Sequence, residues 1–244
     1  MSEHARREAR AKVGALEPFV KGPVLGARVV LTQEHNPRIP YPARAEAELN
    51  VQGRLVRARS AAPSMDAAVD DVAERLQRNL RRYMDRLVEG QRIPETVPAG
   101  EWRHRAWSPP RPPTFARPVD EREIIRRKSF VFDPMPPREA ANTLEDLDHE
   151  FLLFRDSQTD ADALLYWRDD GLLALVEPHG RSTDGGAVHE PSHHPAPITL
   201  ETAVAEMNTV GRRFLFFENA ATRRANVLYR RYDGHYGLIE PADG

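Results

Sequence analysis

The sequence contains no cysteine, which excludes disulfides, thiolate metal sites and thiol nucleophiles. Such a composition suits a reducing compartment, so we expect a cytoplasmic protein. No apolar run approaches the roughly 18 residues that a membrane-spanning helix needs, and residues 1–10 lack the apolar stretch of a signal peptide. We therefore expect no membrane partner.

Sequence signatures of catalysis are also missing. The chain has no G-x-G-x-x-G, no phosphate-binding P-loop and no nucleophile elbow, and its acidic residues are scattered. His35 and His149 stand alone and are typical of surface or core histidines rather than general bases. The sequence thus predicts no enzymatic activity, no cofactor and no small-molecule substrate.

One segment, His189–His193, matches the H-E-x-x-H pattern of zinc peptidases. That motif needs a helix, which sets both histidines on one face. Pro191 stands inside the motif, and Gly185-Gly186 and Pro195 flank it, so a helix is not expected there. We predict a loop over His179–Pro195 without a specific metal site. Adventitious metal binding by this loop and, more remotely, a metallopeptidase are the alternatives.

The most informative feature that is present is an internal repeat. Pro134–Pro178 aligns without a gap with Pro197–Pro241, at an offset of 63 residues, and 14 of the 45 columns are identical. Asp170-Gly171, for example, falls on Asp233-Gly234. A gapless repeat of this length indicates one small fold used twice.

Each repeat predicts a short helix followed by three strands. In the first repeat we expect a helix at Pro137–Leu147 and strands at 151–155, 163–168 and 172–177, with a further strand, Arg126–Phe132, in front. In the second repeat we expect a helix at Thr199–Thr209 and strands at 213–218, 226–231 and 236–240. Apolar residues at strand spacing are interpreted as core or as the surface through which repeats pair: Phe151, Phe154, Tyr166, Leu175, Phe214, Phe217, Tyr229 and Leu238.

The first third of the chain predicts a separate α-β-β-β-α unit. We expect a helix over residues 3–17, strands at Ala27–Glu34, Arg44–Val51 and Arg54–Arg59 with a turn at Gln52-Gly53, and a long helix over Met65–Val88. Seven prolines between Glu89 and Pro118 predict a stiff linker, in which Trp102 and Trp107 are expected to dock on a surface. The fold class is therefore α+β, with an N-terminal domain at 1–88, a linker at 89–119, repeats at 120–178 and 197–244, and a His/Gly/Pro-rich loop at 179–196.

A net charge of −2 hides two halves of opposite sign. Residues 1–128 contain 25 Lys and Arg against 17 Asp and Glu, a balance of +8, and residues 129–244 contain 10 against 20, a balance of −10. This asymmetry predicts that only the first half meets a polyanion, and its arginines favour forked contacts with phosphates. Ordinary solubility charge is the alternative.

Arginines of the long helix form one stripe. At 100° per residue, Arg75, Arg78, Arg82 and Arg86 fall within about 60° of one another, and an apolar stripe lies about 100° away. A row of this spacing can follow a phosphate backbone. Together with the first helix it predicts an RNA-binding surface, and a solvated helix face is the alternative. The basic residues of the first helix are Arg6, Arg7, Arg10 and Lys12.

Three segments of the sequence resemble the long-form ribosome hibernation promoting factors. VLYRRYDGHYGLIEP (Val227–Pro241) looks like the end of their C-terminal domain, and RRKSFVFDPMPPREA (Arg126–Ala140) resembles its start. Pro63–Leu87 resembles the last helix of their N-terminal domain. The doubled C-terminal domain is similar to the mycobacterial dormancy-associated branch of that family.

The resemblance implies a β-α-β-β-β-α N-terminal domain that occupies the decoding groove of the small ribosomal subunit. The basic residues named above would contact 16S ribosomal RNA there, on 30S or 70S particles. In long forms the C-terminal domain homodimerises and joins two ribosomes. Because this sequence opens in the first helix, the family's opening strand is expected to be missing and a sheet edge exposed, unless the start codon is misplaced.

We therefore expect a non-enzymatic factor that blocks messenger and transfer RNA and silences translation under stress. The tandem repeat predicts a monomer whose repeats pair within the chain, with a homodimer through the repeats as the alternative. A protein–protein adaptor in stress regulation, acting through the acidic repeats, is the rival function.

Overall fold

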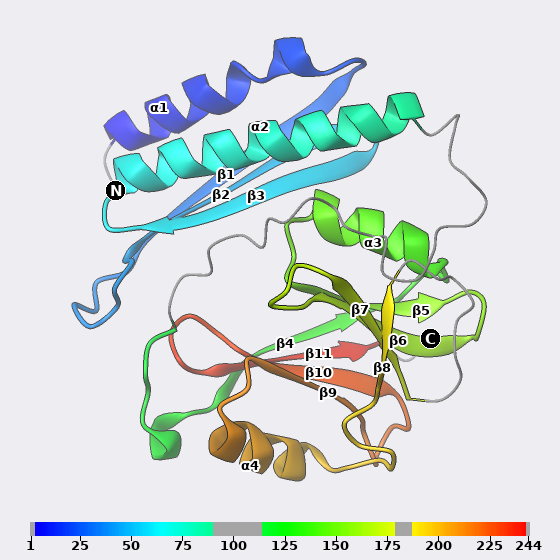
Figure 1. Cartoon of the computed structure of the whole chain (residues 1–244). Helices are drawn as coiled ribbons and strands as arrows, with labels where there is room; N and C mark the ends of the chain where they lie inside the picture. The colour runs from blue at the N-terminus through cyan, green and yellow to red at the C-terminus, as the bar shows by residue number, and fades with distance from the viewer. Residues whose placement is uncertain (1–2, 90–113, 179–186, 243–244) are drawn as a thin grey trace. The chain divides into compact units, whose positions relative to one another are not determined.

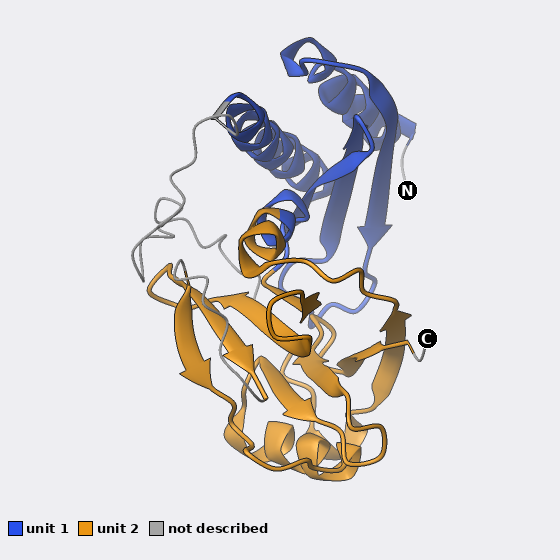
Figure 2. Cartoon of the chain, turned by 90° about the vertical axis from the view of Figure 1, so that its right-hand side faces the viewer, with its two compact units in different colours: residues 1–95, 143–149 blue, residues 96–142, 150–244 orange. Residues whose placement is uncertain are grey.

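The computed structural model describes residues 3–89, 114–178 and 187–242. Trp102, Trp107 and most of the predicted linker lie outside these residues. The chain divides into two compact units, coloured in Figure 2: unit 1 is Met1–Glu95 with Thr143–His149, and unit 2 is Thr96–Asn142 with Glu150–Gly244. None of the helices described is long and apolar enough to cross a membrane.

Unit 1 is a three-stranded antiparallel sheet with two helices on one of its faces (Figure 1). Its elements follow the predicted α-β-β-β-α order, with the strands paired as β1-β2-β3: α1 (Glu3–Gly14), η1 (Glu17–Phe19), β1 (Val24–Gln33), β2 (Ala43–Val51), β3 (Arg54–Ala62) and α2 (Met65–Glu89). The β2–β3 hairpin closes at Gln52-Gly53, where both residues have positive φ as a tight two-residue turn requires.

The core of unit 1 lies between the sheet and its helices. Strand β2 alternates strictly, so that Ala45 and Ala47 are buried while Glu46 between them is exposed. These small side chains leave room for α2, which buries Leu76 and Leu80 against them. The alternation in β2 and the apolar stripe of α2 thus fix which face of each element points inward, and the arginine stripe is left at the margin.

Strand β1 forms one edge of this sheet, since β2 is its one strand partner among the described residues. Its side chains are mostly exposed, with Leu25 at 63%. An exposed sheet edge was expected from the sequence, without a strand being assigned to it. The opposite edge is β3, which lies beside α2.

Unit 2 contains both sequence repeats. Its elements are η2 (Val119–Glu121), β4 (Ile124–Phe130), α3 (Pro137–Asp146, whose last turn belongs to unit 1), β5 (Phe151–Asp156), β6 (Ala161–Trp167), β7 (Leu173–Glu177), β8 (Val188–Pro191), α4 (Leu200–Val210), β9 (Phe214–Glu218), β10 (Ala225–Arg230) and β11 (Tyr236–Pro241). The helix and three strands predicted for each repeat are all present. The prediction of α+β architecture is confirmed.

The two repeats exchange their leading strands. One sheet has the order β5-β6-β7-β8 and the other β4-β11-β10-β9 (Figure 1). Strand β4 precedes the first repeat in sequence but runs parallel to β11 of the second, and β8 precedes the second repeat but runs parallel to β7 of the first. The strand predicted in front of the first repeat therefore exists, but it completes the sheet of the other repeat.

The loop predicted over His179–Pro195 is wrong in one part, because Val188–Pro191 forms strand β8. The prolines and glycines of this segment suggested irregular structure. An edge strand, however, pairs on one side only, and a proline at its end is tolerated there because the lost N–H is not needed by the ladder.

Side chains of the second sheet alternate between two cores. One face of the second sheet packs under α4, where Met207, Phe217 and Leu238 are fully buried. The other face meets the first sheet, where Leu153, Leu164 and Val176 of the first repeat pack with the following residues of the second: Phe216, Ala225 and Val227. Both repeats of one chain therefore share a core.

Candidate functional site

Helix α2 presents the predicted arginines along one edge, but they differ in their surroundings. Arg78 is the most open of the four that the sequence singled out, with its side chain 47% exposed and an ion pair to Glu74 one turn earlier. Arg82 is half-buried and donates to Asn79 Oδ1. The helix period brings these guanidinium groups to one side, as the stripe predicted.

Arg75 has a structural contact as well as a charge. Its Nη1 donates to the carbonyl oxygen of Arg59 at 2.6 Å, and Asn79 Nδ2 donates to the carbonyl oxygen of Arg57 at 2.6 Å. Both acceptors belong to β3, the edge strand, whose outward carbonyls lack a strand partner among the described residues. One turn of α2 therefore binds this edge, and Arg75 is only 14% exposed.

An acidic segment of unit 1, Glu145–Asp148, lies against the same arginines. Arg86 Nη1 donates to Glu145 Oε2 at 2.6 Å and its Nη2 to Asp146, so the guanidinium bridges two carboxylates. Asp148 Oδ2 accepts from the backbone N–H of Arg59 at 3.0 Å and lies 3.9 Å from Arg75. The predicted RNA-binding edge is thus partly occupied by carboxylates of the chain itself.

Burial governs the titration of these acids. It raises the pKa of Asp146 to about 6, although the nearby guanidinium groups of Arg86 and Arg54 act in the opposite direction. Burial also raises the pKa of Asp148, against the hydrogen bond from the N–H of Arg59 and the charge of Arg75. For each carboxylate, the loss of solvent raises the pKa by more than the neighbouring cations and hydrogen bonds lower it.

The basic residues of α1 lie on the exposed side of that helix. Arg6, Arg7 and Arg10 are exposed, while Ala5 and Ala9 between them are buried. Lys12 forms ion pairs with Glu8, at 2.8 Å, and with Asp70 of α2. Of the basic residues singled out from the sequence, the most exposed are therefore the three arginines of α1 together with Arg78.

A second candidate site is the surface on which the repeats pair. Four predicted residues form one aromatic cluster: the ring centroids of Phe151 and Phe214 are 5.2 Å apart, those of Phe151 and Tyr229 5.8 Å, and those of Tyr166 and Phe214 5.1 Å. Tilted and edge-on rings at these separations attract one another beyond the area that they bury. The cluster contains two residues from each repeat.

The other four residues predicted for pairing lie on the opposite strand faces. Phe217 and Leu238 are in the core under α4. Phe154 and Leu175 are buried, and each follows or precedes a residue of the shared core along its strand, so that their side chains point the other way. Spacing along a strand gave the buried residues but did not tell which of the two cores each would enter.

Sequence reasoning missed an ion pair that also joins the repeats. Arg224 Nε and Nη2 donate to Asp162 Oδ2 and Oδ1 at 2.8 and 3.0 Å, and the N–H of Ala225 donates to Oδ2 at 3.1 Å. Burial would raise the pKa of Asp162, but the hydrogen bonds from Arg224 and Ala225 outweigh it and hold the pKa below its ordinary value. The signal was available, because the alignment sets Asp162 against Ala225 and Arg224 against Ala161.

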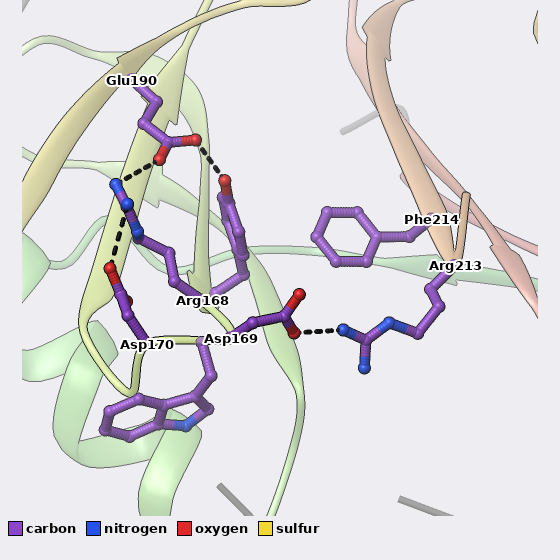
Figure 3. A pocket seen from close by; sticks show the side chains of 8 residues that line it. Arg168, Asp169, Asp170, Glu190, Arg213 and Phe214 are labelled. Carbon is purple, nitrogen blue, oxygen red and sulfur yellow. Dashed lines mark hydrogen bonds and ion pairs between the residues drawn. The ribbon is translucent and has the colours of Figure 1, made fainter. Parts of the chain in front are cut away.

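An open hollow of about 410 Å³ lies where the two repeats meet, lined from both (Figure 3). Arg213 Nη2 of the second repeat donates to Asp169 Oδ1 of the first at 2.6 Å across it. Glu190 accepts from Arg168 at 2.7 Å and from Tyr166, whose pKa is raised by burial and by this carboxylate. The charged groups of the hollow form hydrogen bonds and ion pairs with one another, and the bond from Arg213 to Asp169 joins the two repeats.

The H-E-x-x-H segment lacks the geometry of a zinc site. His189 and Glu190 lie in strand β8, and His193 follows it outside any helix. An extended chain rises about 3.3 Å per residue, so it separates two histidines four positions apart by roughly 13 Å, whereas a helix sets them one turn apart on one face. No group of three or more potential metal ligands occurs among residues 3–89, 114–178 and 187–242.

Comparison with known proteins covers nearly the whole chain. Residues 1–88 match the family model described as Sigma 54 modulation protein / S30EA ribosomal protein. Residues 119–175 and 187–238 match the model described as Sigma 54 modulation/S30EA ribosomal protein C terminus, one match for each repeat.

Individual relatives agree with the family models. The "Dormancy associated translation inhibitor" of Mycobacterium tuberculosis (strain H37Rv) is 30% identical over 251 residues, which cover 98% of this chain and 84% of the relative. The "Ribosome hibernation promotion factor" of Deinococcus radiodurans is 31% identical over 182 residues, 72% of this chain and 92% of the relative. The protein of that name from Bacillus subtilis is 51% identical over 47 residues, 19% of this chain and 25% of the relative.

These matches confirm the resemblance drawn from the three motifs. The chain belongs to the Sigma 54 modulation protein / S30EA ribosomal protein family, with one N-terminal domain and two C-terminal domains of that family in tandem.

Proposed function

We propose that this chain is a ribosome hibernation factor that binds the small ribosomal subunit and silences translation. Relatives over most of its length are named for dormancy, translation inhibition and ribosome hibernation. The observation that carries the proposal is the exposure of arginines on both helices of unit 1: Arg78 on α2 and Arg6, Arg7 and Arg10 on α1.

The binding mode follows from the chemistry of these arginine side chains. Guanidinium groups fork onto phosphate oxygens and recognise a folded RNA by its backbone and shape rather than by its bases. The protein would occupy the decoding region and exclude messenger and transfer RNA sterically, without catalysis. The acidic second half of the chain is unsuited to RNA, and its repeats share a core within one chain. We therefore propose one chain on one 70S particle rather than a link between two ribosomes.

Co-sedimentation with 30S subunits tests the proposal. Neutralising Arg78 and Arg82 to glutamine should lower occupancy at moderate salt and reduce the slope of log affinity against log salt by roughly 1.4, since each lost phosphate contact removes about 0.7 from the slope for single strands. The matched control changes Arg126 and Arg127 of β4, which are exposed in unit 2, and should bind as the parent chain does.

The outcome that contradicts the proposal is salt-independent co-sedimentation, or equal binding by the parent chain and the α2 variant. Recovery of neither ribosomal RNA nor ribosomal protein by the tagged chain would favour the protein–protein adaptor instead.

A further inference from the structure

The pairing surfaces of the two repeats are nearly symmetric. Residues separated by 63 positions are equivalent, so Phe151 corresponds to Phe214 and Tyr166 to Tyr229. Phe151 contacts its own equivalent, and the Phe151–Tyr229 contact is matched by the Tyr166–Phe214 contact. An interface of this kind is isologous in form, and by itself it would accept two copies of the same repeat.

Symmetry is broken at the Asp162–Arg224 ion pair. The equivalent of Asp162 is Ala225 and that of Arg224 is Ala161, so the pair occurs once where a symmetric interface would hold it twice or not at all. Asp162 is 6% exposed, which places its charge out of reach of solvent screening. Within its own repeat the carboxylate has one further cation, Arg155, at 3.3 Å.

Pairing of like repeats would be penalised at this point. Asp162 Oδ2 lies 3.1 Å from the backbone nitrogen of Ala225, which is its own equivalent position. Two first repeats would therefore bring two buried carboxylates together near the pseudo-twofold axis, and like charges so close disfavour the ionised forms. Two second repeats would set Arg224 against Ala225 instead of a carboxylate, so Arg224, whose side chain is 33% exposed, would lose its forked ion pair to Asp162 and gain no attraction in its place.

We propose that Asp162 and Arg224 determine pairing specificity, so that a first repeat accepts only a second repeat. Two chains of this protein can then associate through these surfaces only by exchanging repeats, with each first repeat on the other chain's second. The exchange of β4 and β8 between the sheets adds two strand pairings that break when the repeats separate, and the high effective concentration of two repeats in one chain favours re-forming them there. The inference deepens the proposed pairing of repeats and does not depend on ribosome binding.

Charge reversal in the full chain tests this specificity. Asp162→Arg sets two arginines against each other, and Arg224→Asp sets two aspartates, so each single variant should lose pairing within the chain and unfold at lower urea concentration. The double variant restores opposite charges and should recover part of the lost midpoint, because Asp162→Arg also sets a cation near Arg155 and removes the acceptor of the Ala225 N–H. Arg126→Asp, a matched charge change on the exposed side of β4, should leave the midpoint unchanged.

Co-expression of the two single variants gives the decisive result. Exchange of repeats between them restores opposite charges at both junctions, so differently tagged chains should co-purify and sediment as a two-chain complex, at least tenfold more abundant than in co-expressed parent chains. The proposal is overturned if the single variants unfold as Arg126→Asp does, if the double variant does not recover, or if the co-expressed variants stay separate. Because no readout involves the ribosome, these results stand apart from any failure of the proposed ribosome binding.

Discussion

Asp146 is a buried carboxylate, and the free-energy cost of ionising it in the folded chain should make stability depend on pH. Its pKa rises from 3.8 to about 6, chiefly because burial removes solvent from the charged form. A difference of about 2 pKa units corresponds to about 3 kcal/mol of unfolding free energy, an order-of-magnitude figure at 1.36 kcal/mol per unit.

The sign follows from which state binds the proton more tightly. Between about pH 4 and 6 the folded chain keeps Asp146 protonated while the unfolded chain has lost that proton, so lowering the pH favours folding. Above pH 6 the folded state holds a desolvated charge next to Arg86, and the contribution is lost. This part of the stability should therefore be fully present below pH 4 and absent above pH 6.

Urea unfolding of the parent chain and of Asp146→Asn, at pH 5 and pH 7.5, measures the effect. Asparagine keeps the shape of the side chain and removes its titration. The two proteins should differ in their pH dependence by about 1–2 kcal/mol over this interval, part of the full range, with the parent gaining more on acidification. Asp85→Asn, at an exposed position of α2, serves as the charge-matched control. An unchanged pH dependence in Asp146→Asn would refute the reasoning, because it would mean that Asp146 is hydrated in the folded chain.

Three further substitutions test the packing that positions the two sites, each by urea unfolding followed by circular dichroism. Leu76→Ala removes a fully buried side chain of α2 and should cost about 2–5 kcal/mol. Phe214→Ala removes two ring contacts between the repeats and should cost about 3 kcal/mol, with loss of near-ultraviolet signal from the aromatic cluster. Gly237→Ala would place a Cβ 2.3 Å from the ring of Tyr229 and should cost about 1–3 kcal/mol, whereas no loss would show that this ring moves freely.

Local periodicity was enough to predict the α-helices of both units and every strand except β8. The alternation of β2 and the apolar stripe of α2 each define one inward face, and one sheet whose inward face is covered by two helices leaves little choice of arrangement. The gapless repeat likewise gave the helix and three strands of each C-terminal domain. Both signals depend on residues that are close in sequence, and the structure has the helices and strands that they predict.

The sequence pattern could not predict which strands pair when they are far apart in the chain. The spacing of Ile124–Phe130 identifies a strand but does not tell whether it joins the first sheet or the second, since both offer an equivalent edge. The same limit applies to Phe154 and Phe217, whose burial was predicted but whose choice between two cores was not. For Arg75, the helical spacing predicted which side of α2 it lies on. Its hydrogen bond to the carbonyl of Arg59 could not be predicted, because it depends on β3 being an edge strand.

Under the proposed function, the carboxylates next to the α2 arginines reduce the free energy that each arginine can gain from an RNA phosphate. A phosphate that reaches Arg86 must replace Glu145 and Asp146, so the gain is the difference between two sets of charge-assisted hydrogen bonds rather than the whole of one. Arg78, whose partner Glu74 is exposed, exchanges its carboxylate at lower cost because an exposed ion pair is weak. The effects of neutralising Arg78 and Arg86 should therefore be unequal, and equal losses of ribosome affinity would show that the acidic segment leaves the edge before RNA arrives.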